Sequence, residues 1–110
     1  MAVGSGCTAK SHGDGEAVAM GVNAEAIGQD AVAFGNLAKA HGYHAVAIGT
    51  QAMALAGGST AIGGETYADD AIAIGKFSTT NVKGGIALGK ESKANIDKGV
   101  LGWGSCHHEY

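Results

Sequence analysis

The residues that could carry chemistry are few in this chain of 110 residues, and the richest group of them lies at the C-terminus. Cys106-His107-His108-Glu109 contains three kinds of metal-binding side chain. On a threefold axis, three copies of one histidine could bind a metal ion, which makes His107 and His108 weak candidates for metal ligands. Adjacent residues at a chain end usually fray, so we expect no metal site.

A second pair of histidines, His41 and His44, flanks the dipeptide Gly42-Tyr43. No carboxylate or cysteine stands beside them, so we expect exposed turn residues, with a ligand-contacting rim as the alternative. The serines and threonines lack a His-Asp pattern, and no Gly-Lys-Ser or Gly-Lys-Thr phosphate loop is present. A uniform fold without a concave pocket would also leave no place for shifted pKa values. We therefore predict a protein that is not an enzyme and uses no cofactor.

The backbone that must position these residues is organised around a repeated phrase, Ala45-Val46-Ala47-Ile48-Gly49. Its copies close on glycines at positions 21, 35, 49, 63, 75, 89 and 102, so the steps are 14, 14, 14, 12, 14 and 13 residues. A second phrase, such as Asn23-Ala24-Glu25-Ala26-Ile27-Gly28, follows half a period later. Small or apolar residues at every second position indicate strands. Each repeat therefore predicts two short strands and two tight turns, which form one coil of a β-solenoid.

The composition agrees with such a coil and excludes several classes of protein. The chain has 20 glycines and no proline, and a backbone that turns about every seventh residue needs many glycines. Its net charge of −3 gives no reason to expect a nucleic-acid partner. No apolar run approaches the roughly 20 residues of a membrane span, so we expect no membrane insertion by this segment.

We predict three regions along the chain. Residues 1–16 form an irregular lead-in or cap with a trimmed strand at Ala2-Val3-Gly4, residues 17–102 form the β-roll, and residues 103–110 form a C-terminal cap or tail. The step of 12 residues between Gly63 and Gly75 predicts a shortened or bulged second strand near Tyr67-Ala68. Cys7 and Cys106 would lie on the order of 30 Å apart across six coils, so we expect no bridge within one chain. Disulfide bonds between different chains are the alternative.

The alternation within each strand also suggests how the coil packs. We expect the bulky row of the first strand to pack inward against the alanine row of the second strand, because a thin roll cannot hold two bulky rows. The alanines of the first strand would then lie on an outer face, where identical chains could approach closely. The predicted trimer interface consists of Ala19, Ala33, Ala47, Ala61, Ala73 and Ala87.

The phrase Ala-Val-Ala-Ile-Gly, followed by a small-polar-small segment, resembles the head repeat of trimeric autotransporter adhesins, the YadA-like or Hep/Hag head repeat. The resemblance is close from Glu16 to about Lys90 and looser beyond. It implies an all-β, left-handed parallel β-roll that forms a homotrimer on a bacterial surface, as part of a longer protein anchored in the outer membrane. Phage tail fibres contain the same repeats, so a structural or receptor-binding segment of such a fibre is the alternative.

The resemblance also implies a function in adhesion and virulence. Members of the family bind collagen, fibronectin or laminin, or a receptor on a host cell. The strand motif implicated in collagen binding falls on two stretches of this chain, with His41 and His44 as further candidates at the rim. The candidate ligand-binding residues of the two stretches are Val46, Ala47, Ile48, Gly49, Ile72, Ala73, Ile74 and Gly75.

Overall fold

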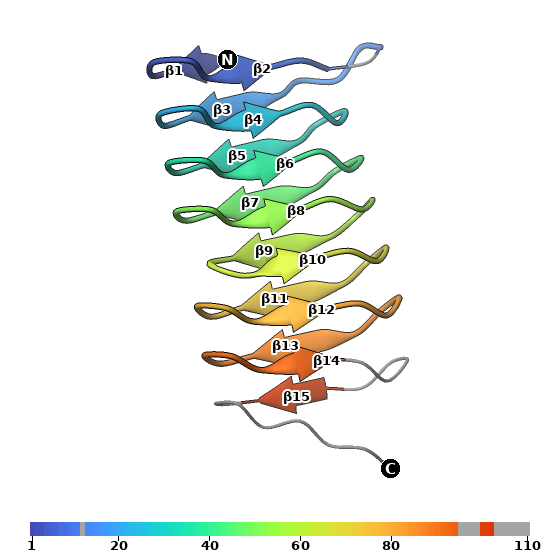
Figure 1. Cartoon of the computed structure of the whole chain (residues 1–110). Helices are drawn as coiled ribbons and strands as arrows, with labels where there is room; N and C mark the ends of the chain where they lie inside the picture. Colours follow the sequence, from blue (N-terminus) through green and yellow to red (C-terminus); the bar gives the residue numbers. More distant parts are fainter. Residues whose placement is uncertain (12, 95–99, 103–110) are drawn as a thin grey trace.

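The chain winds into a flat, regular coil of short parallel strands (Figure 1). The computed structural model describes residues 1–11, 13–94 and 100–102, and these residues contain strands and turns but no helix. The strands form two sheets, which lie on opposite sides of the coil. Sheet A consists of β1 (Ala2–Val3), β3 (Val18–Met20), β5 (Val32–Phe34), β7 (Val46–Ile48), β9 (Thr60–Ile62), β11 (Ile72–Ile74), β13 (Ile86–Leu88) and β15 (Val100–Gly102). Sheet B consists of β2 (Thr8–Ala9), β4 (Glu25–Ala26), β6 (Lys39–Ala40), β8 (Met53–Ala54), β10 (Glu65–Thr66), β12 (Thr79–Thr80) and β14 (Lys93–Ala94).

The register of the sheets follows the sequence period. Ala33 of β5 pairs with Ala47 of β7, and Ala47 pairs with Ala61 of β9. In sheet B, Glu25 pairs with Lys39 and Lys39 with Met53 in the same way. Residues about 14 positions apart therefore stack directly on one another, and the predicted parallel β-solenoid is confirmed.

Glycine follows most strands of sheet A, and at several of these positions the backbone of the next coil passes too close for a side chain. Gly35 has a φ of 133°, and a Cβ placed on it would lie 2.6 Å from the carbonyl oxygen of Gly49. Gly21 and Gly75 meet the following coil in the same manner. The repeated glycine thus satisfies both an unusual backbone angle and a close approach.

The interior of the roll is built almost entirely from alanine. All the buried hydrophobic side chains of the described residues are alanines, and they come from both sheets. Because a methyl group is small, the two sheets approach closely, and the Cα atoms extend only 11 Å along the shortest axis. Close contact between the two sheets takes the place of the large apolar side chains that fill the core of a typical globular domain.

The prediction of which side chains of sheet A face the core was therefore wrong. The alanines at the middle of these strands point into the core, whereas the bulky residues on either side point outward. Ala47 is 0% exposed and its neighbour Ile48 is 38% exposed. Sheet B already places alanines inward, and the roll is too thin to hold a bulky row opposite them.

Hydroxyl groups replace some of the core alanines in the later coils. The buried residues Ser59, Ser78 and Ser92 each donate a hydrogen bond to the carbonyl oxygen three residues earlier. Thr80 donates to the carbonyl oxygen of Ile72 over 2.9 Å. These bonds satisfy the hydroxyl groups within the backbone, so they can enter the core without an unpaired polar atom.

The ends and the irregular coil differ in part from the prediction. The strand at Ala2–Val3 is confirmed, and Thr8–Ala9 pairs with β4, so residues of the predicted lead-in join both sheets. The step of 12 residues shortens the turn between β9 and β10 to Gly63 and Gly64. The prediction of a shortened or bulged strand near Tyr67-Ala68 was wrong, because β10 pairs in unbroken register with both β8 and β12. Trp103, Cys106, His107, His108 and the remaining tail lie outside the described residues.

Candidate binding faces

The outer face of sheet A is apolar from β1 to β13, with Thr60 as its one hydroxyl-bearing residue. Two rows of side chains point outward from its strands, one on each side of the central alanine. We call these rows the apolar face. It consists of Val3, Val18, Met20, Val32, Phe34, Val46, Ile48, Thr60, Ile62, Ile72, Ile74, Ile86 and Leu88.

This face contains no charged residue, and several of its side chains are open to solvent. Phe34 is 50% exposed, and Ile48, Ile62, Ile74 and Leu88 are 37–39% exposed. Seven strands spaced by about 4.8 Å make a strip of roughly 30 Å in length. A contiguous apolar strip of this size on one chain indicates an interaction surface.

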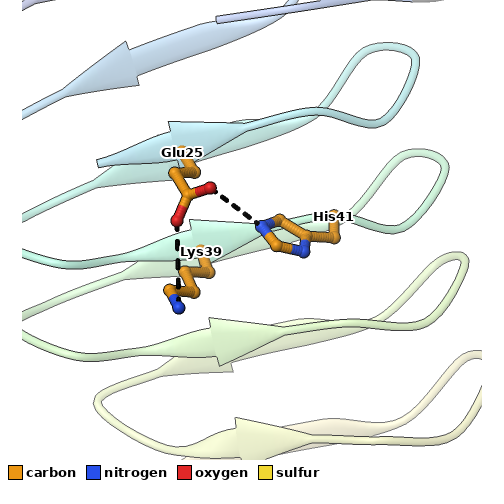
Figure 2. Close-up of polar contacts among 3 residues, drawn as sticks. All are labelled: Glu25, Lys39 and His41. Carbon is orange, nitrogen blue, oxygen red and sulfur yellow. Dashed lines mark ion pairs between the residues drawn. The ribbon is translucent and has the colours of Figure 1, made fainter. Parts of the chain in front are cut away.

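The outer face of sheet B is polar and charged. Thr8, Glu25, Lys39, Met53, Glu65, Thr79 and Lys93 stack in register along it. Figure 2 shows its densest polar group, in which one carboxylate meets two basic side chains. Glu25 Oε2 lies 3.8 Å from Lys39 Nζ, and Glu25 Oε1 lies 3.7 Å from His41 Nε2.

The cluster of Glu25, Lys39 and His41 lies at the surface, so it contributes little to stability. All three side chains are 34–39% exposed, where water screens their attraction. The Nε2 atom of His41 is buried and has no hydrogen-bond partner within the described chain. Protonation of His41 would strengthen its attraction to Glu25, since the imidazole then carries a charge.

A second polar pair lies farther along the same face. Tyr67 donates a hydrogen bond of 2.6 Å from its hydroxyl group to Oε2 of Glu65. This bond to the carboxylate, together with partial burial and the negative charge of Glu65, raises the pKa of Tyr67 to about 12. The raised pKa extends the range over which the phenol stays neutral and donates, from about pH 10 to about pH 12.

The structure distributes the predicted ligand-binding residues over several places. Val46, Ile48, Ile72 and Ile74 belong to the apolar face, whereas Ala47 and Ala73 are buried in the core. Gly49 and Gly75 lie in turns along one edge of the roll. They do not form one site, and their part in ligand binding stays a prediction.

The two predicted histidines are also separated. His41 follows β6 and lies beside Glu25 on sheet B. His44 lies three residues on in the same connection to β7, where its Nε2 is 3.6 Å from Asp30 Oδ2 and its ring centroid is 4.0 Å from that of Tyr43. His44 is exposed, as expected for a turn residue, and a part in a ligand-contacting rim stays a prediction.

The predicted trimer interface needs correction. Its six alanines pair in one continuous row along sheet A, and all six are 0% exposed in the single chain. A side chain enclosed by its own coil cannot contact a second chain. The residues concerned are Ala19, Ala33, Ala47, Ala61, Ala73 and Ala87.

Residues 1–11, 13–94 and 100–102 contain no group of three or more His, Cys, Asp or Glu side chains placed to hold a metal ion. Across the same residues, the fold has no helix with the length and hydrophobicity that crossing a bilayer requires.

Sequence reasoning missed the apolar face and the cluster around Glu25. The signal for the cluster was present, because Lys39 follows Glu25 by one 14-residue period and carries the opposite charge. Residues at the same position of successive coils are neighbours across the sheet. The signal for the apolar face was the row of Val, Ile, Met, Phe and Leu itself, once the alanines are assigned to the core.

The comparison with protein families agrees with this geometry. The model of the YadA head domain repeat, which contains two copies of the repeat, matches residues 16–38, 40–66 and 67–92. A search of curated proteins found no match. The three matched segments cover most of the chain and coincide with its regular coils. The chain therefore belongs to the family of YadA head domain repeats, which form the surface-exposed heads of trimeric autotransporter adhesins.

Proposed function

We propose that this chain is a non-catalytic adhesin head that works as a homotrimer on a bacterial surface and binds extracellular matrix proteins or a host receptor. The observation that carries the proposal is the contrast between the two outer faces. Sheet A presents a flat strip without charge, and sheet B presents a row of mostly charged and polar side chains. One face suits packing between identical chains, and the other suits contact with water and ligand.

The apolar face supports the assembly. Three rolls packed side by side around a common axis would remove Phe34, Ile48, Ile62, Ile74 and Leu88 from water. Together with Val3 of β1, which is 47% exposed, these are the side chains of the apolar face that a single chain leaves most exposed. The interface proposed from the sequence thus moves from the alanines to the bulky rows on the same strands.

Ligand binding then falls to the surfaces that remain outside the trimer. Sheet B carries Glu25, Lys39 and His41 on its outer face, and each trimer would present three copies of this cluster. Repetition supports adhesion because several weak contacts to one long ligand act together. The motif residues Val46 and Ile48 would act indirectly, through the assembly.

The test is binding of the purified trimer to immobilised collagen, fibronectin and laminin. Three single variants are compared with the wild type: Lys39→Glu on sheet B, Ile48→Asp on the apolar face and Lys10→Glu as a charge-matched control. We expect saturable binding to at least one protein, reduced by Lys39→Glu in the trimeric state and unaffected by Lys10→Glu. A trimer that binds none of them would contradict the matrix-adhesin function and favour the tail-fibre alternative.

A further inference from the structure

One edge of the roll carries a column of single peptide groups, one for each turn that leads from sheet A to sheet B. Each group donates its N–H to the carbonyl oxygen of the group in the preceding coil. Leu37 N–H donates to Val22 over 2.9 Å, Gln51 N–H to Asn36 over 2.8 Å, and Glu91 N–H to Lys76 over 2.8 Å. We call this series the turn column.

The turn column is interrupted at the short coil. Gly63 donates to the carbonyl oxygen of Ile48, as Gly49 donates to Phe34 one coil earlier, and Gly64 accepts from Met53 as Ala52 accepts from Lys39. Gly63 and Gly64 therefore occupy the places of Gly49 and Ala52, and the two residues between them are missing. The absent residues are those that would supply this coil's group in the column.

The interruption leaves one acceptor and one donor without partners. The carbonyl oxygen of Thr50 accepts no hydrogen bond from the described residues. The N–H of Phe77 donates no hydrogen bond to any described residue. Both groups belong to the same column, so they face the gap from opposite sides. Two coil spacings of about 4.8 Å separate them, which leaves room for one layer of atoms between them.

The gap is a real hollow in the surface. It has a volume of about 440 Å³ and is lined by Thr50, Gln51, Gly63, Glu65, Lys76 and Phe77. In Figure 1 the turn between β9 and β10 is set back from the turns above and below it. Gly63 brings no side chain into the hollow, whereas Phe77 stands 60% exposed at its side with Lys76 Nζ 5.1 Å from the ring centroid.

The opposite edge of the roll provides an internal comparison. There, His44 N–H donates to Gln29, Gly58 to Tyr43, Asp70 to Gly57 and Gly84 to Asp69, over 2.7–3.0 Å. That series passes through the same coils without a break. The open donor and acceptor thus arise from the short turn at one edge and not from an irregular coil as a whole.

We propose that this gap binds the acetamido group of an N-acetylated sugar. A secondary amide offers one N–H and one carbonyl oxygen on opposite sides, which is what the missing peptide group would offer to Thr50 and Phe77. An acetamido group ends in a methyl group, which fits against Gly63. The sugar ring then lies at the mouth of the hollow beside the exposed ring of Phe77, with the Gln51 and Lys76 side chains available to its hydroxyl groups.

This inference rests on the proposed function as a binding head and names one ligand chemistry for it. The gap lies at the turn edge, away from Lys39 and His41 on sheet B. Loss of matrix binding on Lys39→Glu and loss of sugar binding at the gap are therefore separate outcomes. Two hydrogen bonds that replace bonds to water predict weak affinity, with a Kd of about a millimolar per site.

The test is a titration of the isotope-labelled protein with triacetylchitotriose, followed by the NMR signals of its backbone amides. We expect the Phe77 amide proton to move downfield as it gains an acceptor, while the amides of Gly58 and Asp70 on the opposite edge stay in place. Cellotriose, which has the same backbone without acetamido groups, should leave Phe77 unchanged. Equal shifts with both sugars, or no shift of Phe77, would overturn the proposal.

Two further arms sharpen the result. N-acetylglycine N-methylamide tests a peptide source of the amide, and a shift of Phe77 with this probe alone would overturn the sugar and assign the gap to peptide. Insertion of Thr-Gln between Gly63 and Gly64 restores the 14-residue period and fills the column with the chain's own peptide group. We expect the inserted variant to lose at least tenfold in affinity for triacetylchitotriose. Unchanged affinity in the folded variant would contradict the proposed site.

Discussion

Replacement of Ala47 by leucine tests the alanine core most sharply. Ala47 is completely buried and lies between Ala33 and Ala61, which are equally buried. Leucine adds three carbon atoms at a point where the sheets are separated only by methyl groups. Overpacking of a closed core typically costs about 1–3 kcal/mol. We expect a loss near 3 kcal/mol, because neighbouring alanines have no larger side chain that could move aside.

The assay is urea unfolding followed by far-ultraviolet circular dichroism at one fixed protein concentration. With a slope of about 2 kcal/mol per molar urea, a loss of 3 kcal/mol lowers the midpoint by about 1.5 M. Ala2→Leu is the matched control, because Ala2 pairs with Ala19 in the same row but is exposed at the open end of the roll. Its midpoint should change little. An Ala47→Leu variant as stable as Ala2→Leu would refute the inward direction of the alanines.

Three other predictions follow from the turns, the core hydroxyls and the tyrosine. Gly35→Ala should cost at least about 3 kcal/mol, because its Cβ would meet Gly49 at 2.6 Å. When both variants are compared by thermal unfolding, Gly63→Ala should cost only about 1 kcal/mol, because its Cβ meets no atom closer than 3.6 Å. Ser78→Ala should lose about 1 kcal/mol with its bond to Gly75, and an unchanged melting temperature would contradict this. In an ultraviolet titration of tyrosinate, Tyr67 should ionise near pH 12, and Glu65→Gln should return its pKa toward 10.0.

The sign of the tyrosine effect on stability follows from the raised pKa. The folded state favours the neutral phenol, so the contribution of Tyr67 is complete below about pH 10 and is lost as the pH rises toward 12. The side chain is 46% exposed, and solvent screening keeps this contribution small. A Glu65→Gln variant should therefore resemble the wild type in stability at neutral pH while differing in the titration.

The coil and its register could be predicted from the sequence because a constant period fixes which residues of successive coils pair with each other. Once each repeat contains two strands and two turns, residues 14 positions apart must stack, and Ala33, Ala47 and Ala61 do. The family could be predicted for the same reason, since the repeated phrase carries both the fold and the resemblance.

The direction of the side chains could not be fixed by period alone. Alternation in Ala45-Val46-Ala47-Ile48 allows either row to face inward, and the choice depends on how far apart the two sheets stand. That distance is set jointly by both strands, and β6 and β8 contribute only alanine side chains to the core at Ala40 and Ala54. Two small rows pack closest, which leaves Val46 and Ile48 outside.

The place where the short coil loses its two residues could not be predicted from the period either. The sequence shows that the coil after Gly63 is short, but not which part of it gives way. A shortened strand would break several hydrogen bonds with both neighbouring coils, whereas the shortened turn removes one peptide group and leaves one acceptor and one donor open at the surface. The loss therefore falls on the turn, and this is the origin of the gap between Thr50 and Phe77.

The molar mass in solution, measured by light scattering, tests the central claim most directly. We expect the wild type to have three times the chain mass of 10.8 kDa. Ile48→Asp places a charge on the apolar face and should give a folded monomer, whereas Lys39→Asp on sheet B should remain trimeric. A monomeric wild type, or an Ile48→Asp variant that stays trimeric, would contradict assembly through the apolar face.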